Sequence, residues 1–370
     1  MSISIIAKVT HNCNLGCAYC YVNSAAEQGV MDEYTLGTML GKVSKLNEES
    51  GRTRIIWHGG EPLIAGKEFY RRAVGEQSRL SHTFINGIQT NGTLLNEEFL
   101  DFFEEHKFGI GFSLDGTQET HDKNRPYRNG KSSFTPTFDA IKRAQERHIN
   151  NGVICVLNQN TYRRIEEIYQ FLKDNRISFK VNPQIPCGRA LETDLALSSR
   201  ELSATLTRLF DRWFYDDTTT PIDIDPFTDL IGNIGKSRNS EPPENYPGNC
   251  VFRNNCANSF LAVVPNGNVY PCGRFVGETE YLLGNINEDS IEDILDSPVR
   301  KQLLKRASQL PKTCTACDYS RICKSGCPDN ARSMNGDIFA RDGFCSAYKT
   351  LFRHIEKTIK KELEAYHART

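Results

Sequence analysis

The chain of 370 residues is long enough for two domains, or for one large α/β domain with an appendage, and its 38% hydrophobic and 25% charged residues are typical of a globular protein. Its 45 basic and 46 acidic residues give a net charge of −1 without a basic block, which argues against a nucleic-acid-binding surface. No window reaches the roughly 18 apolar residues of a membrane span, and the first residues lack the pattern of an export signal. We therefore expect a soluble, cytoplasmic protein without nucleic-acid or membrane partners.

Strand-like and helix-like runs alternate from residue 3 to about residue 221. The strand-like runs lie at residues 3–9, 53–59, 85–90, 109–114, 152–157 and 179–185. Between them, residues 96–107 and 164–175 carry the apolar spacing of amphipathic helices. This alternation predicts an α/β fold with a parallel sheet, and six such rounds predict a partial (β/α)6 barrel rather than the closed eight-unit barrel.

Each predicted strand runs into a polar or glycine-bearing loop. The first loop holds three cysteines, and the later ones read "HGGEP", "QTNGT", "SLDG", "LNQN" and "NPQIPCGRA". In a β/α barrel these loops share one rim, the face on which active sites are found. The sequence therefore predicts a site on that rim.

Thirteen cysteines in a chain without an export signal favour metal binding over a disulfide framework. Eleven of them form two groups, a triplet near the start and eight between Cys250 and Cys345. Cys155 and Cys187 stand alone in apolar, strand-like surroundings, and we expect them to be small core residues.

The triplet, Cys13, Cys17 and Cys20, can wrap a loop around one metal centre. Without a fourth thiolate, one iron of a [4Fe-4S] cluster would stay open to bind another molecule, as a catalytic zinc keeps a free position. A zinc site completed by His11 or His58 is the alternative.

The triplet, with an aromatic residue before its third cysteine, and "GGEP" after the second strand resemble the motifs of radical S-adenosylmethionine enzymes. The resemblance covers essentially the whole chain. It implies that the open iron binds the amino and carboxylate groups of S-adenosylmethionine, whose one-electron cleavage gives methionine and a 5′-deoxyadenosyl radical. The cofactor-binding residues that the resemblance implies are Tyr19, Gly59, Gly60, Glu61, Ser113 and Leu157.

From about Ile222 the βα alternation stops and a cysteine-rich, helix-rich region follows. It resembles the SPASM extension of radical enzymes that modify peptides and proteins, so we expect a barrel domain over 1–221 and an auxiliary-cluster domain over 222–370. The resemblance implies two auxiliary [4Fe-4S] clusters that transfer electrons. One would be held by Cys250, Cys256, Cys272 and Cys327, and the other by Cys314, Cys317, Cys323 and Cys345. A zinc ribbon is the alternative for these cysteines.

The resemblance implies an oxidoreductase that acts on a peptide or protein, with an electron donor such as flavodoxin or ferredoxin. One branch of the family, the anaerobic sulfatase-maturating enzymes, oxidises Cys or Ser to formylglycine. Where that branch has an aromatic residue followed by a base Asp, this chain has Phe227 followed by Thr228, and the nearest candidate catalytic carboxylates are Asp225 and Asp229. A base must reach its proton, and one residue along a helix turns a side chain by about 100°.

Another branch matures ribosomally made precursor peptides and forms cyclophane carbon–carbon or thioether crosslinks. The stretches "IIWHGGEPLIAGKEFY" and "VNPQIPCGRA" look more like this branch, so we expect a crosslinking enzyme, with formylglycine formation as the alternative. No separate leader-binding segment precedes the first strand, so we expect the rim, the extension or another protein to recognise the precursor. An iron–sulfur or zinc redox module without catalysis is a third hypothesis.

Two further residues follow the fourth strand. His121 and Arg125 could contact substrate or S-adenosylmethionine, or belong to a solvated loop. By contrast, Trp57 and Tyr70 are expected in the core.

Overall fold

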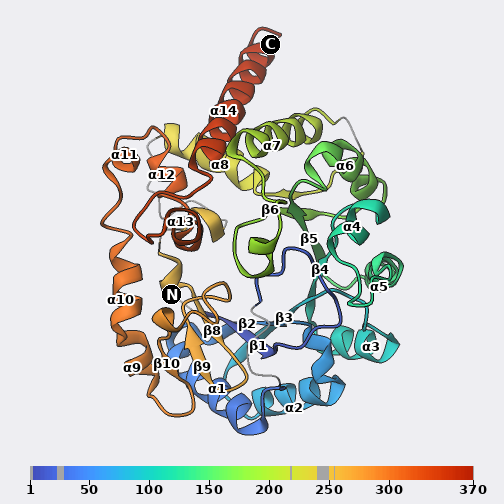
Figure 1. The fold of residues 1–370 in the computed structure, drawn as a ribbon, viewed down its shortest axis with the longest axis vertical. Coiled ribbons are helices and arrows are strands. Elements are labelled where there is room, and N and C mark those ends of the chain that lie inside the picture. Colours follow the sequence, from blue (N-terminus) through green and yellow to red (C-terminus); the bar gives the residue numbers. More distant parts are fainter. Residues whose placement is uncertain (1–2, 23–28, 217–218, 240–249, 254, 370) are drawn as a thin grey trace. The chain divides into compact units, whose positions relative to one another are not determined.

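The computed structural model describes residues 3–22, 29–216, 219–239, 250–253 and 255–369 (Figure 1). The chain folds as two compact units, each assembled from separate stretches of sequence. The first comprises Met1–Leu114, His121–Val153 and Asn255–Lys305, and the second comprises Asp115–Thr120, Ile154–Asn254 and Arg306–Thr370. Each unit draws on both predicted sequence domains, whose boundary at residue 221 stays a prediction.

All six predicted strands are present. They are β1 (Ser4–Thr10), β2 (Arg52–Gly59), β3 (Thr83–Thr90), β4 (Gly109–Ser113), β5 (Asn151–Leu157) and β6 (Phe179–Pro183). The helices predicted over 96–107 and 164–175 are α3 (Glu97–Glu105) and α6 (Ile165–Asp174). Asn96 caps α3 by accepting a hydrogen bond from the Phe99 amide at 3.0 Å, so the polar start of this pattern marks the helix start. The predicted α/β fold is confirmed.

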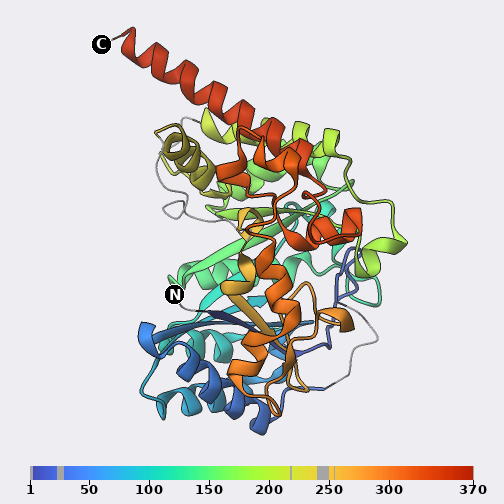
Figure 2. The ribbon, with the colours of Figure 1, turned by 90° about the vertical axis from the view of Figure 1, so that its left-hand side faces the viewer.

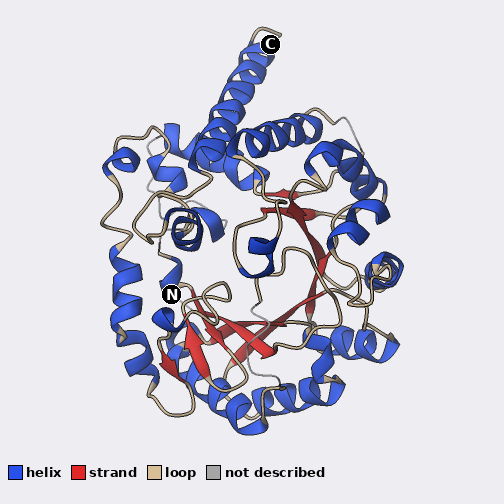
Figure 3. Ribbon diagram, viewed as in Figure 1, coloured by secondary structure: helices blue, strands red, loops and turns tan. Residues whose placement is uncertain are grey.

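The sheet of the first unit has the strand order β10-β9-β8-β1-β2-β3-β4, and its strands are red in Figure 3. β1 pairs in parallel with β2, β2 with β3, and β3 with β4. Because these strands are parallel, the loops that follow them leave the sheet at one edge, and the cysteine triplet and "GGEP" are on two of these loops.

Three short strands of this sheet come from the cysteine-rich part of the sequence and were not predicted. β8 (Phe260–Val263) pairs in parallel with β1, and β9 (Asn268–Tyr270) and β10 (Gly284–Asn285) follow in antiparallel pairing. The turn between β8 and β9 contains Gly267 at φ +86°, a conformation that glycine adopts readily. The "PNGN" sequence before β9 was the available hairpin signal.

Helices α1 (Glu33–Leu46), α2 (Lys67–Ser78) and α3 cover one face of β1 to β4 (Figures 1 and 3). Trp57 and Tyr70 are fully buried there and meet edge to face with ring centroids 5.9 Å apart, so the predicted core position of both residues is confirmed. The Tyr70 hydroxyl donates to the Pro62 carbonyl at 2.8 Å and so ties the "GGEP" loop to α2. The unit also contains α5 (Phe134–Glu146), α9 (Ile291–Asp296) and α10 (Pro298–Lys305), and α4 (Gln118–Asn124) runs into it from the second unit.

The second unit contains most of β5, then β6 and β7 (Ile224–Asp225), with β6 and β7 paired in parallel. Its helices are α6, α7 (Ser199–Phe214), α8 (Phe227–Arg238), α11 (Lys312–Thr315), α12 (Ser320–Cys323), α13 (Pro328–Asn335) and α14 (Cys345–His367). The long helix α14, red in Figure 2, packs on α7 and α8, and the pairs His354–Asp211 and Glu356–Arg238 join it to them. None of the described helices is both long and apolar enough to cross a membrane.

A buried arginine organises the part of the second unit that carries five of the later cysteines. Arg306 is fully buried, and its guanidinium donates to the backbone carbonyls of Ser325, Gly326, Ile338 and Ala340. The carboxylate of Asp342 accepts from the amides of Cys327 and Phe344 in the same region. Because buried carbonyls need donors, Arg306 holds together two stretches that have little regular structure of their own.

We expect Arg306→Met to destabilise the protein by about 2–4 kcal/mol, since it leaves several buried carbonyls without a donor. Urea unfolding of the purified protein measures the change. Arg353→Met on the exposed side of α14 is the matched control and should change stability by less than about 0.5 kcal/mol. Equal stability of Arg306→Met and the control would contradict this role of Arg306.

Candidate functional site

The cysteine loop begins where β1 ends and closes over the glycine pair at the end of β2. The amides of Gly60 and Glu61 donate to the carbonyls of Thr10 and Asn12, both at 2.8 Å. A Cβ atom on Gly59, whose φ is +148°, would lie 2.2 Å from the Thr10 oxygen, and one on Gly60 would lie 2.4 Å from the Asn12 oxygen. The two glycines are therefore required by the close approach of the two backbones, independently of any ligand.

Glu61 is fully buried and joins two of the rim loops. One carboxylate oxygen accepts from the Leu63 amide at 3.0 Å and the Thr90 hydroxyl at 2.7 Å, and the other accepts from the Asn91 amide at 2.8 Å. Burial raises the pKa of Glu61 to about 7, against the opposing effect of these hydrogen bonds. Glu61 thus has a structural role in this chain, and its contact with S-adenosylmethionine stays a prediction.

Cys13 receives hydrogen bonds from two directions. The Leu15 amide donates to its sulfur at 3.4 Å, and the Asn91 side chain donates at 3.9 Å. Burial raises the pKa of the Cys13 thiol to about 11, and the charges of Glu61 and Cys20 raise it further. The two N–H donors directed at its sulfur are of the kind that stabilises a cluster-bound thiolate, so the loop fits an iron–sulfur cluster, and the ligation itself stays a prediction.

The segment from Asn124 to Arg128 borders the cysteine loop. The amides of Gly16 and Ala18 donate to the carbonyls of Pro126 and Asn124, at 2.8 and 2.9 Å. In the same segment the Arg125 guanidinium lies 5.2 Å from the centre of the Tyr19 ring.

His121 and Arg125 are both buried. The structure therefore rules out the solvated-loop interpretation of these two residues. His121 interacts with the Ser133 hydroxyl at 2.9 Å, which makes it part of the packing behind the loop.

A lysine, a tyrosine and a histidine gather beside the loop. The Lys8 ammonium is buried and lies 4.9 Å from the centre of the Tyr21 ring, and the Tyr21 hydroxyl is 3.4 Å from Nε2 of His58. Burial and the charge of Lys8 lower the pKa of His58 to about 4, so His58 is neutral at pH 7. A Cβ on Gly273, the residue after Cys272, would lie 3.4 Å from Cε of Lys8. Lys8 thus lies close to the segments of two predicted clusters.

The remaining predicted cofactor contacts lie at strand ends. Ser113 ends β4 and accepts a hydrogen bond from the Gln89 side chain at 3.3 Å. Leu157 ends β5, is fully buried and belongs to the second unit. The contacts of Tyr19, Ser113 and Leu157 with S-adenosylmethionine stay predictions.

Four predicted cluster ligands lie together in the second unit: Cys314, Cys317, Cys323 and Cys345. Burial raises the pKa of Cys323 well above its usual range, and negative charge at Asp342 and the other three cysteines raises it further. Burial also raises the pKa of the Cys345 thiol, and the charges of Cys314 and Cys317 raise it further. A set of four neighbouring cysteines suits an iron–sulfur cluster held by four thiolates, and this ligation stays a prediction.

The other predicted set is divided between the units. Cys256 and Cys272 belong to the first unit, and Cys250 and Cys327 belong to the second. Their joint ligation of a cluster stays a prediction. Among the described residues, no three His, Cys, Asp or Glu side chains are arranged around a single metal ion.

The candidate catalytic carboxylates lie in the second unit, near β6. Asp225 forms an ion pair with Lys180 at 3.1 Å, and Asp229 lies in the first turn of α8. Burial and the charge of Asp225 raise the pKa of Asp229. Thr228, at the position where the sulfatase-maturating branch is expected to have its base, is exposed.

The sequence missed several residues that shape the cysteine loop, chiefly Lys8, Asn91 and the segment Asn124–Arg128. Lys8 lies within a predicted strand, on the face opposite Ala7 and Val9. A lysine at such a position is usually exposed, so the pattern gave no sign of its burial beside the cysteine loop. Asn91 lies in the polar loop "QTNGT", so its position on the rim could be predicted from the sequence. Its hydrogen bond to Cys13 could not. Of the two lone cysteines, Cys155 is fully buried and Cys187 is half-buried.

Comparison with protein families gives two matches. Residues 7–172 match the model of the Radical SAM superfamily, and residues 250–318 match the SPASM model, an iron–sulfur cluster-binding domain. The first range contains the cysteine triplet, Glu61 and Ser113, and the second contains five of the eight later cysteines. The resemblances to radical SAM enzymes and to the SPASM extension are confirmed, together with S-adenosylmethionine and [4Fe-4S] clusters as the cofactors.

Comparison with whole proteins extends the match to both ends of the described chain. A cysteine-type anaerobic sulfatase-maturating enzyme of Clostridium novyi is 31% identical over 97% of this chain and 96% of its own length. The structure of native anSMEcpe with bound AdoMet is 25% identical, with a TM-score of 0.86 over 98% of this chain and 100% of that one. Its complex with AdoMet and the Cp18Cys peptide is 26% identical, with a TM-score of 0.84 over 99% and 100%. The chain therefore belongs to the radical SAM superfamily of enzymes with a SPASM domain, in the family that includes the anaerobic sulfatase-maturating enzymes.

Proposed function

We propose that this radical SAM peptide- or protein-modifying enzyme removes two hydrogens from its polypeptide substrate and joins a side-chain carbon to a neighbouring aromatic ring. The observation that supports a crosslink concerns position 228, where the sulfatase-maturating branch is expected to have its base. This chain has an exposed Thr228 there, and the neighbouring Asp225 is paired with Lys180. Formylglycine formation needs a base for the thiol or hydroxyl proton, whereas attack on a ring can end with proton loss to water or to any nearby carboxylate.

The cofactors, when bound, supply the 5′-deoxyadenosyl radical that takes a hydrogen atom from the substrate. The chain's own residues hold the reacting groups in place. Gly59 and Gly60 fix the cysteine loop, and Glu61 and Asn91 join it to the next loop of the rim. Lys8 places a buried positive charge beside Tyr21 and the neutral His58, which disfavours a second cation at this side of the loop.

The new bond of a crosslink leaves one electron and one proton to be removed from the ring. We propose that the auxiliary clusters accept this electron and that an external donor such as flavodoxin or ferredoxin supplies the electron that starts each cycle. The four cysteines Cys314, Cys317, Cys323 and Cys345 would hold one of these clusters without an open position. Such a cluster transfers electrons without binding substrate.

Formylglycine formation is the second candidate. Its support is the 31% identity to a cysteine-type sulfatase-maturating enzyme over nearly all of both chains. In this reaction the radical would take one hydrogen atom from the β-carbon of a Cys, the base would take the thiol proton, and an auxiliary cluster would accept the remaining electron. Water would then replace the sulfur with a carbonyl oxygen and release hydrogen sulfide. Asp229 is the base that we would assign, because its raised pKa makes its carboxylate a better proton acceptor than an ordinary surface aspartate.

Iron content tests the cluster assignment. We expect anaerobically reconstituted protein to hold about twelve irons, from three clusters of four. Cys13, Cys17 and Cys20 changed together to Ala should lose about four irons and all cleavage of S-adenosylmethionine, because these thiolates hold the cluster that binds it. Colorimetric iron analysis and chromatography of 5′-deoxyadenosine measure both. Changing Cys155 to Ala is the control and should retain all irons, while zinc in place of iron would contradict the assignment.

The product distinguishes the two chemistries. With peptides encoded by genes adjacent to this one, we expect a product lighter by two hydrogens, with an unchanged thiol count and a new link at an aromatic ring. Tandem mass spectrometry locates the link. Asp229→Asn should slow crosslinking only partly, by less than about tenfold, because water or another carboxylate can take the ring proton.

A cysteine peptide with a sulfatase motif serves as the comparison substrate. Its conversion to an aldehyde that reacts with hydrazine, without crosslinking of any neighbouring peptide, would establish the second candidate. In that case Asp229→Asn should lower the rate by at least about a hundredfold, since a base contributes roughly 10²–10⁴.

A further inference from the structure

Four glycines lie on neighbouring strands of the first unit: Gly87 on β3, Gly109 and Gly111 on β4, and Gly152 on β5. Glycine weakens a strand interior because it loses much conformational freedom and contributes no side-chain packing. A group of strand glycines therefore marks a bulge, a bend or a place where another group approaches the backbone.

Among the described residues, a neighbour excludes a side chain at only one of these four glycines. A Cβ on Gly111 would lie 2.3 Å from Oε1 of Gln89, whose side chain crosses it. The nearest atom to a Cβ on Gly87 or Gly109 would be a backbone oxygen at 3.7 or 3.8 Å, which is an ordinary contact, and nothing described lies within 4 Å of one on Gly152. Gly87, Gly109 and Gly152 also do not have positive φ. Neither packing nor backbone conformation requires glycine at these three positions.

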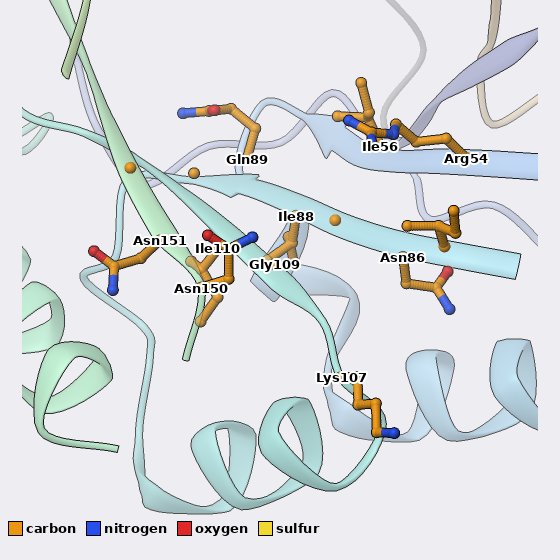
Figure 4. Close-up of a pocket in the computed structure, with 14 residues that line it drawn as sticks. Arg54, Ile56, Asn86, Ile88, Gln89, Lys107, Gly109, Ile110, Asn150 and Asn151 are labelled. Atoms are coloured by element: carbon orange, nitrogen blue, oxygen red, sulfur yellow. The ribbon is translucent and has the colours of Figure 1, made fainter. Parts of the chain in front are cut away.

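These glycines border a cavity of about 450 Å³ that lies wholly within the first unit. Its volume falls within the range of roughly 300–1,000 Å³ that is usual for ligand sites. The lining residues come from β2, β3, β4 and the start of β5 (Figure 4). Four neighbouring strands span about 14 Å, so a peptide segment of about four extended residues would be long enough to cross them.

The side chains around the cavity define what it can bind. Figure 4 shows Arg54, Ile56 and Gln89 on one side of the sheet, whereas Asn86 and Ile88 point to the other. Ile85 is 41% exposed and so adds apolar surface to this part of the sheet. Among the described residues, Arg54 has no carboxylate partner. This surface offers apolar contacts and one guanidinium, which suits a carboxylate.

The cavity extends from the amino-terminal ends of β4 and β5, where Lys107, Asn150 and Asn151 line it, to Gln89 near the carboxyl end of β3. Gln89, which lines it, donates a hydrogen bond to Ser113 at the end of β4, where the predicted contact with S-adenosylmethionine lies. A segment that occupied the cavity would therefore lie next to the loops of the candidate active site.

We propose that this cavity binds an extended, acidic segment of the polypeptide substrate, with its backbone over Gly87, Gly109 and Gly152 and a carboxylate on Arg54. The inference rests on the proposed function only in that the substrate is a polypeptide. The glycines permit close approach of the bound backbone, Ile56 and Ile85 contact its apolar side chains, and Arg54 selects acidic over basic sequences.

Binding of two labelled peptides tests the proposal directly. The probes are rhodamine-labelled Gly-Leu-Glu-Leu-Glu-Leu-Glu-Gly and the same peptide with Lys in place of Glu, measured by fluorescence anisotropy on the reconstituted protein at low salt. We expect the glutamate peptide to bind at least about tenfold more tightly, and Arg54→Glu to remove that preference. Arg52→Glu, on the same strand but outside the cavity lining, is the matched control and should keep it.

Filling the cavity tests the role of the glycines. Gly152→Leu should weaken binding of the glutamate peptide at least about tenfold while the melting temperature falls by less than about 2 °C, since its new side chain meets open space. Gly41→Leu, on α1 and equally uncrowded, is the control. Equal binding of both peptides, unchanged binding in Arg54→Glu and Gly152→Leu, or displacement of the glutamate peptide by S-adenosylmethionine would each overturn the proposal.

Catalysis separates this inference from the proposed function. If the glutamate peptide binds as described but no polypeptide is modified, the proposed function fails and the cavity assignment stands. If a substrate is modified and Arg54→Glu leaves its KM unchanged, the cavity assignment fails and the proposed function stands.

Discussion

The close approach of two backbones at the ends of β1 and β2 is the constraint on which the candidate active site depends. The cysteine loop can hydrogen-bond to Gly60 and Glu61 only because Gly59 and Gly60 have no side chains, since a Cβ on either would lie within 2.5 Å of a carbonyl oxygen. The same turn directs Glu61 inward, where its carboxylate binds the next loop through Thr90 and Asn91. Asn91 in turn donates to Cys13. One steric requirement thus connects three rim loops to the first predicted iron ligand.

Buried thiols impose a second constraint, which is electrostatic. Cys13 and Cys323 lie where burial and neighbouring negative charge raise their pKa, so their thiolates are unstable in the protein alone. Ligation by a positively charged cluster would offset that penalty. Arg306 contributes in another way, because it donates to backbone carbonyls near the second cysteine group. Local structure and cluster charge therefore stabilise different parts of the same region.

The sequence predicted what depends on local pattern. Strand and helix periodicity located β1 to β6, α3 and α6, and the spacing of cysteines identified both cluster regions. Contacts between distant segments could not be predicted in this way. The pairing of β8 with β1 joins residues about 255 positions apart, and Asn124–Arg128 borders the cysteine loop through backbone bonds that do not depend on side-chain type. The burial of Arg125 could not be predicted either. A charged side chain is usually exposed, and the Tyr19 ring that it contacts is distant in the sequence.

The glycines of the first unit show how one residue type serves two purposes. Gly59 and Gly60 have side-chain positions filled by the protein's own backbone, so their identity is explained by folding. Gly87, Gly109 and Gly152 have side-chain positions that no described atom crowds, so folding alone would favour a β-branched residue at each. The sheet lacks that stabilisation at these three positions, which lie on neighbouring strands, and it keeps open space on one face. Because Gln89 lines that space and donates a hydrogen bond to Ser113, the open face of the sheet and the end of β4 are joined by one side chain.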